Sequence, residues 1–293
     1  ALTVDPPVLM AQTVYHVDAS AGHDSNTGTQ WNQAFATLSK ALVEAGTDDQ
    51  IWIAEGTYRP DEGPGATPDA RTSTFTLDGT HDGLGIYGGF QNGDAFADRN
   101  PAAHPVVLSG DVKETPGDAT DNAYVVLKID GSRAGPVTQA TRIEGITITG
   151  GYDNRSFFGG GGVGSGIQCR ASGTGTECSP TLSALVVAHN RVDGGLGGGG
   201  MAIDVSRGGT GNPVLESCLF VHNAAQPSLL GGGALMVLLS DGGVAARPVI
   251  EGCTFAHNST TKDGGGLYAG TSGAVEPQIS NTIFWGNTAG RGP

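Results

Sequence analysis

The sequence predicts an all-β fold: a right-handed parallel β-helix solenoid with an N-terminal capping helix. Three observations predict it: 50 glycines in 293 residues, many short apolar runs, and a repeat in the second half of the chain. This glycine content is more than twice the usual share of about 7 %. The glycines follow no triplet period, which excludes collagen, and recurring Val, Ile, Leu and Phe argue against a disordered chain.

The repeat consists of four segments that share one order of residues. Each has a proline, an aliphatic residue two positions later, an apolar pair and then an asparagine, in residues 180–190, 213–223, 248–258 and 277–287. The asparagines recur at spacings of 33, 35 and 29 residues. Glycine runs at 197–200, 231–233 and 264–266 separate the strands of each repeat. One repeat therefore corresponds to one coil, whose short strands pair with the coils above and below, about 4.8 Å away.

Equivalent positions of the repeat are expected to stack inside the solenoid. The asparagines would form a ladder of side-chain hydrogen bonds worth a net ~1 kcal/mol each. The phenylalanines three positions before a ladder asparagine would form an internal stack. The histidines one position before it would form a stack of neutral imidazoles, and a metal site is the alternative for them. These residues are Asn190, Asn223, Asn258 and Asn287; Phe220, Phe255 and Phe284; and His189, His222 and His257.

The N-terminal part differs from the regular coils. Residues 1–13 are expected to be a tail and 14–293 a single β-helix domain, with the cap and irregular coils in 14–140 and regular coils in 141–293. Phe35, Leu38, Leu42 and Ala45 recur at helical spacing, which predicts an amphipathic helix that covers the first coil. Strands are expected at 14–17, 51–53, 75–77, 84–87, 106–108, 124–127 and 143–148.

The four cysteines fall into two pairs. Cys169 and Cys178 bracket the small-residue loop 170–177 and are the candidate pair for a disulfide, which would cross-link this loop in an oxidising compartment. The spacing alone leaves the bridge open. Cys218 and Cys253 occupy equivalent repeat positions, so they are interpreted as stacked core thiols, with metal binding as the alternative.

Charge and length limit the function classes. Lys plus Arg total 15 against 29 Asp plus Glu, and the net charge of −14 opposes binding to nucleic acid. It also repels polyanions such as pectate unless calcium or a local cationic groove mediates the contact. No run approaches the ~18 apolar residues of a membrane span. The chain begins at Ala1 without an initiator Met, so we expect an exported protein, secreted or on a bacterial cell surface.

Several segments resemble a known superfamily. Residues 15–29, 35–38, 51–58, 86–90, 108–111 and 121–124 resemble the N-terminal part of bacterial pectate-lyase-like right-handed β-helix proteins. The Phe-x-x-Asn and Gly-Gly-x-Leu units, as in 220–223 and 232–235, resemble chlamydial polymorphic outer-membrane-protein repeats. The resemblance runs from about residue 15 to residue 287. It implies the fold, and it admits polysaccharide lyases, glycosidases, adhesins and other surface proteins.

The lyase and hydrolase signatures of that superfamily are missing. The Arg-x-Pro-x-x-Arg pattern of pectate lyases and the Gly-His-Gly of polygalacturonase-like hydrolases are absent. The best remaining cluster is in residues 111–122, where Lys113 with Asp111 and Asp121 are candidate catalytic residues. Asp111, Asp118 and Asp121 are also candidate ligands of a calcium ion. A solvated acidic loop is the alternative.

Aromatic residues and the last coil complete the functional hypotheses. Trp31, Tyr58 and Trp285, with Trp52, could stack on sugar rings or serve as packing. The expected function is a non-catalytic binding, adhesion or assembly module that contacts polysaccharide or other surface proteins. A polysaccharide lyase or glycoside hydrolase is the alternative. The last coil, which ends near Asn287, is expected to continue in a longer protein or to self-associate, because its strand edges are uncovered.

Overall fold

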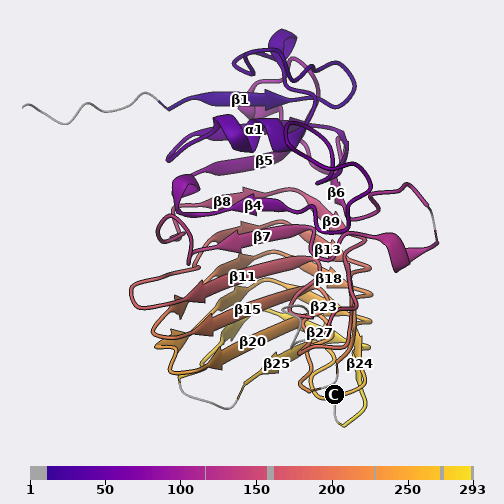
Figure 1. The fold of residues 1–293 in the computed structure, drawn as a ribbon, viewed down its shortest axis with the longest axis vertical. Helices are drawn as coiled ribbons and strands as arrows, with labels where there is room; N and C mark the ends of the chain where they lie inside the picture. The colour runs from indigo at the N-terminus through magenta and orange to yellow at the C-terminus, as the bar shows by residue number, and fades with distance from the viewer. Residues whose placement is uncertain (1–11, 116, 157–161, 228, 271–273, 292–293) are drawn as a thin grey trace, which may run out of the picture.

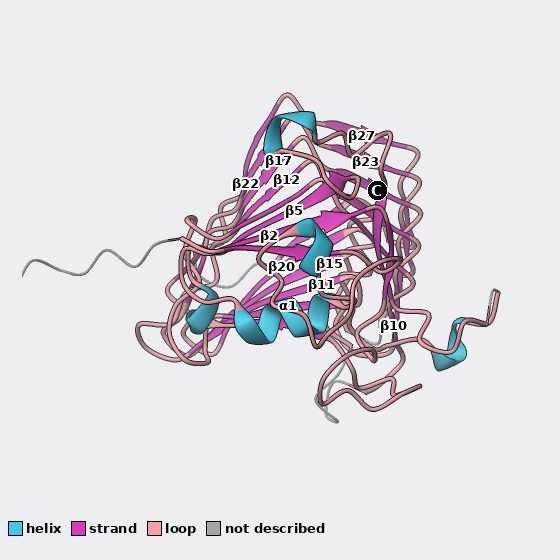
Figure 2. Cartoon of the chain, turned by 90° about the horizontal axis from the view of Figure 1, so that it is seen from above, coloured by secondary structure: helices cyan, strands magenta, loops and turns pink. Residues whose placement is uncertain are grey.

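The computed structural model describes residues 12–115, 117–156, 162–227, 229–270 and 274–291. It is a stack of coils with β1 at one end and β25 and the C-terminus at the other (Figure 1). Strands of successive coils pair in parallel, and the sheets enclose the core on three sides (Figure 2). This is the predicted right-handed parallel β-helix. Most of the expected tail, residues 1–11, lies outside the described residues.

Four principal sheets run along the stack, and we number them for reference. Sheet 1 contains β1 (Val14–Val17), β2 (Gln50–Ala54), β5 (Gly85–Phe90), β8 (Arg142–Glu144), β12 (Thr181–Ser183), β17 (Val214–Glu216), β22 (Val249–Glu251) and β26 (Gln278–Ser280). Sheet 2 contains β3 (Gly56–Tyr58), β6 (Val106–Ser109), β9 (Thr147–Thr149), β13 (Val186–Ala188), β18 (Leu219–Val221), β23 (Thr254–Ala256) and β27 (Ile283–Trp285).

The other sheets complete each turn of the coil. Sheet 3 contains β4 (Phe75–Leu77), β7 (Leu127–Asp130), β11 (Ile167–Ser172), β15 (Met201–Ser206), β20 (Leu235–Ser240) and β25 (Leu267–Ala269). Sheet 4 contains β10 (Tyr152–Asp153), β14 (Arg191–Asp193), β19 (Ala224–Gln226), β24 (Ser259–Thr260) and β28 (Thr288–Ala289). A small sheet pairs β16 (Thr210–Gly211) with β21 (Ala245–Ala246).

Helices are short and lie among the early coils. They are α1 (Leu38–Glu44) and the 3-10 helices η1 (Trp31–Gln33), η2 (Gly79–His81), η3 (Phe96–Asp98) and η4 (Ala119–Asp121). Helix α1 contacts β1 and β4, so it sits at the end of sheet 3 where a further strand would lie (Figure 1). Its Leu38, Ala41 and Leu42 are buried in the core. The predicted capping helix is therefore present, but Phe35 precedes it rather than belonging to it.

Two left-handed residues frame each of the last five strands of sheet 2 in chain order, from β9 to β27. A residue with positive φ turns the chain from sheet 1 into sheet 2, and a second one turns it out again. The first set is Gly145, Ala184, Ser217, Gly252 and Asn281, with φ between 49° and 70°; the second is Gly150, His189, His222, His257 and Gly286, with φ between 54° and 75°. Glycine adopts this region freely, whereas a Cβ makes it costly. The histidine position of the repeat is therefore a corner, which explains why glycine replaces it at Gly286.

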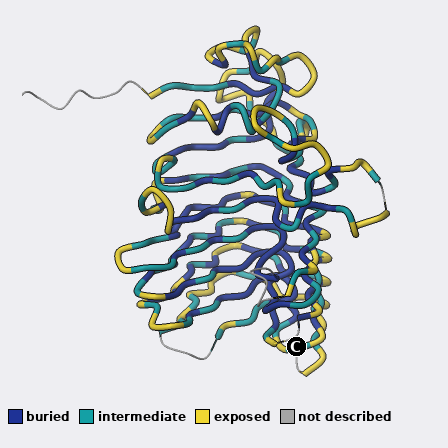
Figure 3. The backbone as a smooth tube through the Cα atoms, viewed as in Figure 1, coloured by how far each residue is buried: buried dark blue, intermediate teal, exposed yellow. Residues whose placement is uncertain are grey.

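The predicted stacks are present in the core. The rings of Phe220 and Phe255 lie 4.8 Å apart, and so do those of Phe255 and Phe284. Asn190 Nδ2 donates to Asn223 Oδ1 at 3.1 Å, and the same bond joins each later pair, at 3.0 Å and 2.9 Å. The buried apolar residues form one continuous cluster along the stack. Buried segments recur from coil to coil along the backbone (Figure 3).

The cysteine pairs behave differently. Cys169 and Cys178 form the disulfide, with their Cα atoms 5.8 Å apart. Residues 170–172 belong to strand β11, so the expectation of a loop over 170–177 was wrong for its first three residues. Cys218 and Cys253 are free and buried, and Cys218 N donates to Cys253 Sγ at 3.4 Å. The neighbouring Cys253 thiol and burial raise the pKa of the Cys218 thiol, which makes it unreactive.

Two strand expectations were also wrong. The segment 143–148 was expected to be one strand, whereas β8 ends at Glu144, Gly145 turns the chain and β9 begins at Thr147. The segment 124–127 was expected to be a strand, whereas β7 begins at Leu127. Tyr124 and Val125 precede it because Tyr124 N donates to Arg71 O, outside the ladder of sheet 3. Among the described residues, no helix is long and apolar enough to span a membrane.

The phenylalanine stack gives a direct test of the register. Phe255→Ala should lower the free energy of unfolding by about 3–5 kcal/mol, because Phe255 is fully buried between two rings. Phe284→Ala is the matched control. Phe284 is 42 % exposed and stacks on one ring only, so its loss should be clearly smaller in urea denaturation. Equal losses for the two variants would contradict the register.

The corners give a second test. Ala184→Gly should raise the free energy of unfolding by about 0.5–1 kcal/mol, because Ala184 has φ 49° and glycine removes the Cβ penalty. Ala188→Gly, in strand β13, should lower it by a similar amount because the extended backbone gains nothing from glycine. Thermal unfolding monitored by circular dichroism measures both. A stabilising effect of both variants would refute the assignment of residue 184 as a strained corner.

Candidate functional site

The outer face of sheet 3 carries polar side chains near the N-terminal end. In β7, Leu127 and Ile129 point into the core, so Lys128 and Asp130 point outward. The register aligns two outward rows across the sheet. The first row is Thr76, Lys128, Gln168, Ala202 and Met236, and the second is Asp130, Arg170, Asp204 and Leu238. Both rows change from polar to apolar toward the C-terminal end.

Glycine-rich turns cover the apolar half of this face. Ala202 and Met236 are fully buried although they point outward, because Val163 and Leu196 of the turns pack against them. The turns lie so close to one another that a Cβ on Gly197 would overlap Gly231 O. The cover reaches the polar half at Gln168, whose Nε2 donates to Val163 O at 3.1 Å. Lys128, Gln168 and Arg170 of the polar half line a pocket that is described below.

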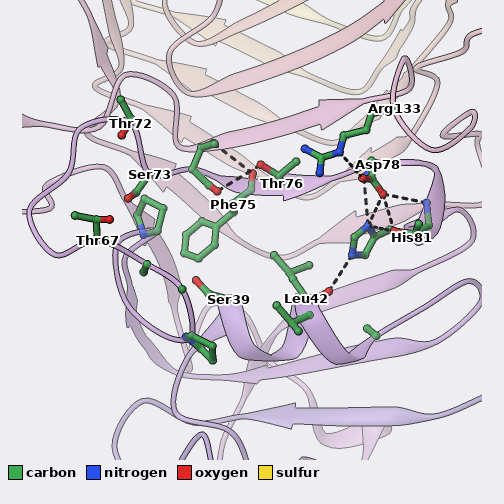
Figure 4. A pocket seen from close by; sticks show the side chains of 18 of the residues that line it. Ser39, Leu42, Thr67, Thr72, Ser73, Phe75, Thr76, Asp78, His81 and Arg133 are labelled. Carbon is green, nitrogen blue, oxygen red and sulfur yellow. Dashed lines mark hydrogen bonds and ion pairs between the residues drawn. The ribbon is translucent and has the colours of Figure 1, made fainter.

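A groove of about 740 Å³ runs between helix α1 and strand β4 at this end (Figure 4). Its volume lies within the 300–1,000 Å³ typical of small-molecule sites. Seven of its nineteen lining residues carry a hydroxyl group, and as many are apolar, among them Leu42 and Phe75. The hydroxyl-bearing residues are Ser39, Thr67, Thr72, Ser73, Thr74, Thr76 and Thr80. We call this feature the hydroxyl groove.

Asp78, His81 and Arg133 form the polar end of the hydroxyl groove (Figure 4). His81 Nε2 donates to Leu42 O at 3.0 Å, and its Nδ1 accepts the Asp78 N–H at 3.2 Å. Both ring nitrogens are thus used to hold η2 against the end of α1. Burial raises the pKa of Asp78, but hydrogen bonds from Thr80 and the neighbouring His81 outweigh it and leave this pKa below its usual value. His81 is therefore a positioning residue rather than an available base.

A smaller pocket of about 230 Å³ adjoins the groove, and Thr72 and Thr74 line both. We call it the cationic pocket, because three of its described lining residues are cations: Lys128, Arg155 and Arg170. Asp153 is the one carboxylate among them. The lining residues of the pocket thus include more cations than carboxylates, although the whole chain has almost twice as many acidic as basic residues.

Arg155 is held rigidly in the cationic pocket. Its Nε and Nη2 donate to the two oxygens of Asp153, at 2.9 Å and 2.8 Å. Asp153 is buried and also accepts the Gly162 N–H at 2.7 Å. The guanidinium of Arg155 lies 4.2 Å from the centre of the Tyr124 ring, which the guanidinium of Arg71 approaches to 4.3 Å. This bidentate, stacked arrangement pre-organises Arg155 for an anion.

Lys128 and Arg170 have carboxylate partners from the same face. Lys128 Nζ lies 2.8 Å from Asp130 Oδ2, so it is placed as an ammonium donor rather than a proton acceptor. Arg170 Nε lies 4.0 Å from Asp204 Oδ2 and has no hydrogen-bond partner among the described residues. Burial raises the pKa of Asp204, although Arg170 opposes this. Arg170 is thus the least satisfied of the three cations.

The acidic segment lies elsewhere. It extends from the side of the stack around η4, right of β9 in Figure 1. Asp111 Oδ1 accepts the Thr115 N–H and Asp121 accepts the Thr115 hydroxyl, both at 3.0 Å, whereas Asp118 caps η4. Lys113 is exposed, and none of these candidates lines the groove or the pocket.

The metal hypotheses receive no support from this geometry. No group of three His, Cys, Asp or Glu side chains within the described ranges is placed to hold a metal ion. The histidine rings stack at 5.3 Å and 5.4 Å, in line with a stack of imidazoles. Calcium binding by Asp111, Asp118 and Asp121 stays a prediction.

The predicted sugar-stacking residues lie away from the site. Tyr58 is buried, and its hydroxyl donates to Ala54 O at 2.9 Å, so its expected contact with sugar was wrong. Trp31 packs on His16 and Phe90 and donates to Asp94 O. Trp52 stacks on Phe90 at 5.0 Å. Trp285 is 68 % exposed in the last coil. Sugar stacking by Trp31 and Trp285 stays a prediction.

Sequence reasoning did not single out the cations of the pocket. The alternation of apolar and polar residues in 127–130 and 167–172 could have indicated them, because it places Lys128 and Arg170 on the outer face of their strands. The pairing of these two strands could not be obtained from the repeat, which covers only later coils.

Asp130 and Asp204, on either side of Arg170, should respond oppositely to pH. Burial raises the pKa of Asp130, but its ion pair with Lys128 and the Ser132 N–H outweigh burial and lower it, whereas burial raises the pKa of Asp204. Asp130 therefore stabilises the fold at pH values above about 3.9, the pKa of an Asp in the unfolded chain. This stabilisation is lost as the pH falls through the lower pKa that Asp130 has in the folded protein. Ionised Asp204 destabilises the fold at pH values above the raised pKa that it has in the folded protein. This destabilisation disappears below about pH 3.9, where Asp204 is protonated in the unfolded chain as well.

The corresponding variants test this assignment. At pH 7, Asp130→Asn should lower the free energy of unfolding by about 1–2 kcal/mol and Asp204→Asn should raise it by about 1 kcal/mol. In urea titrations of the variants and the parent protein, the Asp204→Asn difference should be gone below about pH 3.9, and the Asp130→Asn difference should shrink as the pH falls below that value. If the two variants shift stability in the same direction at pH 7, the assignment is wrong.

Two solved structures show a remote likeness to the chain. A pectate lyase, Pel9A, is 12 % identical over 94 % of this chain and 78 % of its own, with a TM-score of 0.37. A rhamnogalacturonan lyase is 12 % identical over 92 % of this chain and 87 % of its own, with a TM-score of 0.22. Likenesses this remote carry no argument about activity. No curated protein matches the chain.

A protein family matches more than half of the chain. It is described as "Protein of unknown function (DUF1565)", and it matches residues 20–174. The matched range holds helix α1, the early coils and all of the described residues that line the groove and the pocket. The resemblance of the later coils to chlamydial outer-membrane-protein repeats is not shown by any of these matches. The chain belongs to the DUF1565 family.

Proposed function

We propose that this protein is a non-catalytic binding module for an acidic glycan. The hydroxyl-bearing sugar units would lie in the hydroxyl groove, and a carboxylate or sulfate group would enter the cationic pocket. The observation that carries the proposal is that Lys128, Arg155 and Arg170 line one pocket that is continuous with a groove of hydroxyl groups. Cations are needed there because the rest of the acidic surface repels a polyanion.

The state of the cations favours binding over catalysis. Arg155 is fixed by Asp153, and Lys128 is held by Asp130, so both are donors to an anion. A polysaccharide lyase remains the second candidate, because its chemistry uses Lys or Arg as the base and a cation to neutralise the uronate carboxylate. The pocket contains both residue types. The two candidates differ in whether the glycan is changed.

We also propose that the protein acts outside the cytoplasm. The disulfide between Cys169 and Cys178 supports this, because such bonds persist in oxidising compartments. Acidic glycans are met at cell surfaces and in the surrounding matrix, so location and proposed ligand agree. Whether the protein is secreted or attached to the surface is part of the same proposal.

Binding should depend on Arg170. In calorimetric titrations, an acidic oligosaccharide should bind with an affinity that falls with salt, and a neutral oligosaccharide of equal length should bind much more weakly. Arg170→Gln should raise the Kd for the acidic ligand by about ten- to a hundredfold, as for the loss of one charged hydrogen bond. Arg191→Gln is the matched control, because Arg191 has the same exposure, 44 % against 43 %, but lies outside the pocket.

Three outcomes would overturn this proposal. Equal affinity for acidic and neutral oligosaccharides would remove the role of the cations. A loss of affinity in Arg191→Gln but not in Arg170→Gln would place binding elsewhere. Appearance of unsaturated uronate products that vanish in Lys128→Gln would replace the binding module by a lyase.

A further inference from the structure

A strap of chain forms one wall of the hydroxyl groove. The strap consists of residues 60–74, which lie between β3 and β4, and eight of its residues line the groove. Its Thr67, Thr72 and Ser73 lie along one side of the groove (Figure 4). A local turn holds its middle, where Ala70 N donates to Thr67 O at 3.2 Å. The position of this wall therefore depends on how the two ends of the strap are attached to the coils.

Arg71 attaches the second end of the strap. Its Nε donates to Asn122 O at 2.6 Å, and its Nη2 donates to Tyr152 O at 2.8 Å. Its own carbonyl accepts the Tyr124 N–H at 2.8 Å. A planar guanidinium holds two acceptors at once in a fixed geometry, which a Lys ammonium does not. Because Thr72, the next residue, lines both the groove and the cationic pocket, Arg71 fixes the strap where the two meet.

Arg71 also supports Arg155 of the cationic pocket. The guanidiniums of Arg71 and Arg155 lie 4.3 Å and 4.2 Å from the centre of the Tyr124 ring, which is part of the pocket lining. The π face of an aromatic ring attracts a cation, so the shared ring offsets part of the repulsion between the two guanidiniums. Asp153 and the Tyr124 ring together hold the Arg155 side chain. The Tyr124 ring thus links the position of Arg71 to that of Arg155.

We propose that Arg71 is a positioning residue that couples the hydroxyl groove to the cationic pocket. It holds the strap at the groove and, through Tyr124, the Arg155 guanidinium at the pocket, so one side chain aligns both parts of the site. This inference rests on the proposed glycan site and deepens it, because Arg71 itself lines neither the groove nor the pocket. Even an acidic sugar that fills the pocket alone depends on Arg71, through the orientation of Arg155.

Arg71→Lys tests the coupling, because it keeps the charge and loses the planar guanidinium. The probes are galacturonate, a single acidic sugar that can fill the pocket, and trigalacturonate, which can also extend into the groove. The variant should raise the Kd of both probes about three- to tenfold, as for the loss of a cation–π contact. The fall of affinity with salt should stay as in the parent protein, since the charge is kept. NMR titrations measure both Kd values.

Arg59→Lys is the matched control at the other end of the strap. Arg59 Nε donates to Asp111 O at 3.0 Å, and Arg59 does not line the pocket. This substitution loosens the same wall from the opposite end, so the Kd of galacturonate should stay unchanged. A second variant serves if Arg71→Lys fails to fold. Tyr124→Leu leaves both carbonyl contacts of Arg71 in place and removes the shared ring, so it should raise the Kd of galacturonate by the same factor.

The outcomes separate this inference from the proposed function. If the parent protein binds trigalacturonate but folded Arg71→Lys or Tyr124→Leu leaves the Kd of galacturonate unchanged, the coupling is wrong and the glycan site stands. An equal rise of this Kd in Arg59→Lys would also overturn the coupling, because it would show a general loosening of the strap. A parent protein that binds neither probe would overturn the inference, and the proposed function as well if sulfated oligosaccharides also fail to bind.

Discussion

Hydrogen bonding of each coil to the coil before it is the constraint on which the rest of the structure depends. Parallel pairing fixes the strand positions in every coil, so differences in length between coils must be absorbed outside the sheets. The left-handed corners around sheet 2 show how tightly the path is held, because they recur in five coils even where Ala, Ser, His or Asn must adopt positive φ. The phenylalanine and asparagine stacks follow from the same alignment.

The same constraint produces the candidate site. Because the strands of sheet 3 keep their register, outward residues from different coils line up into rows. The glycine-rich turns fold over Ala202 and Met236, whereas Lys128, Gln168 and Arg170 line a pocket on the same face. Lys128 and Arg170 meet there although 42 positions of sequence separate them. Ion pairs with Asp130 and Asp204 hold these two cationic side chains in place on a surface that is otherwise acidic.

The regular coils could be predicted from the sequence, because their order of Pro, aliphatic, apolar pair and Asn repeats at a nearly constant spacing. The capping helix could also be predicted, since Leu38 and Leu42 have helical spacing. The candidate site could not be predicted, because its residues come from irregular coils whose register depends on pairing across long insertions. Tyr58 was misjudged for a related reason: an aromatic residue in a short strand can face either side, and only the pairing of β3 with β6 turns it inward.

The asparagine ladder has a direction, and its members therefore depend on one another unequally. Every ladder amide donates toward the C-terminus, from Asn190 to Asn223 and onward to Asn287. In a solenoid each coil contacts only its neighbours, so the loss of one ladder side chain acts first on the adjacent coils. Replacement of Asn223 would remove an acceptor from the buried Nδ2 of Asn190, whereas Nδ2 of Asn258 would keep both of its acceptors, Phe220 O and Asn287 Oδ1. A defect in the ladder would thus leave unsatisfied donors in the coil on its N-terminal side rather than in the coil on its C-terminal side.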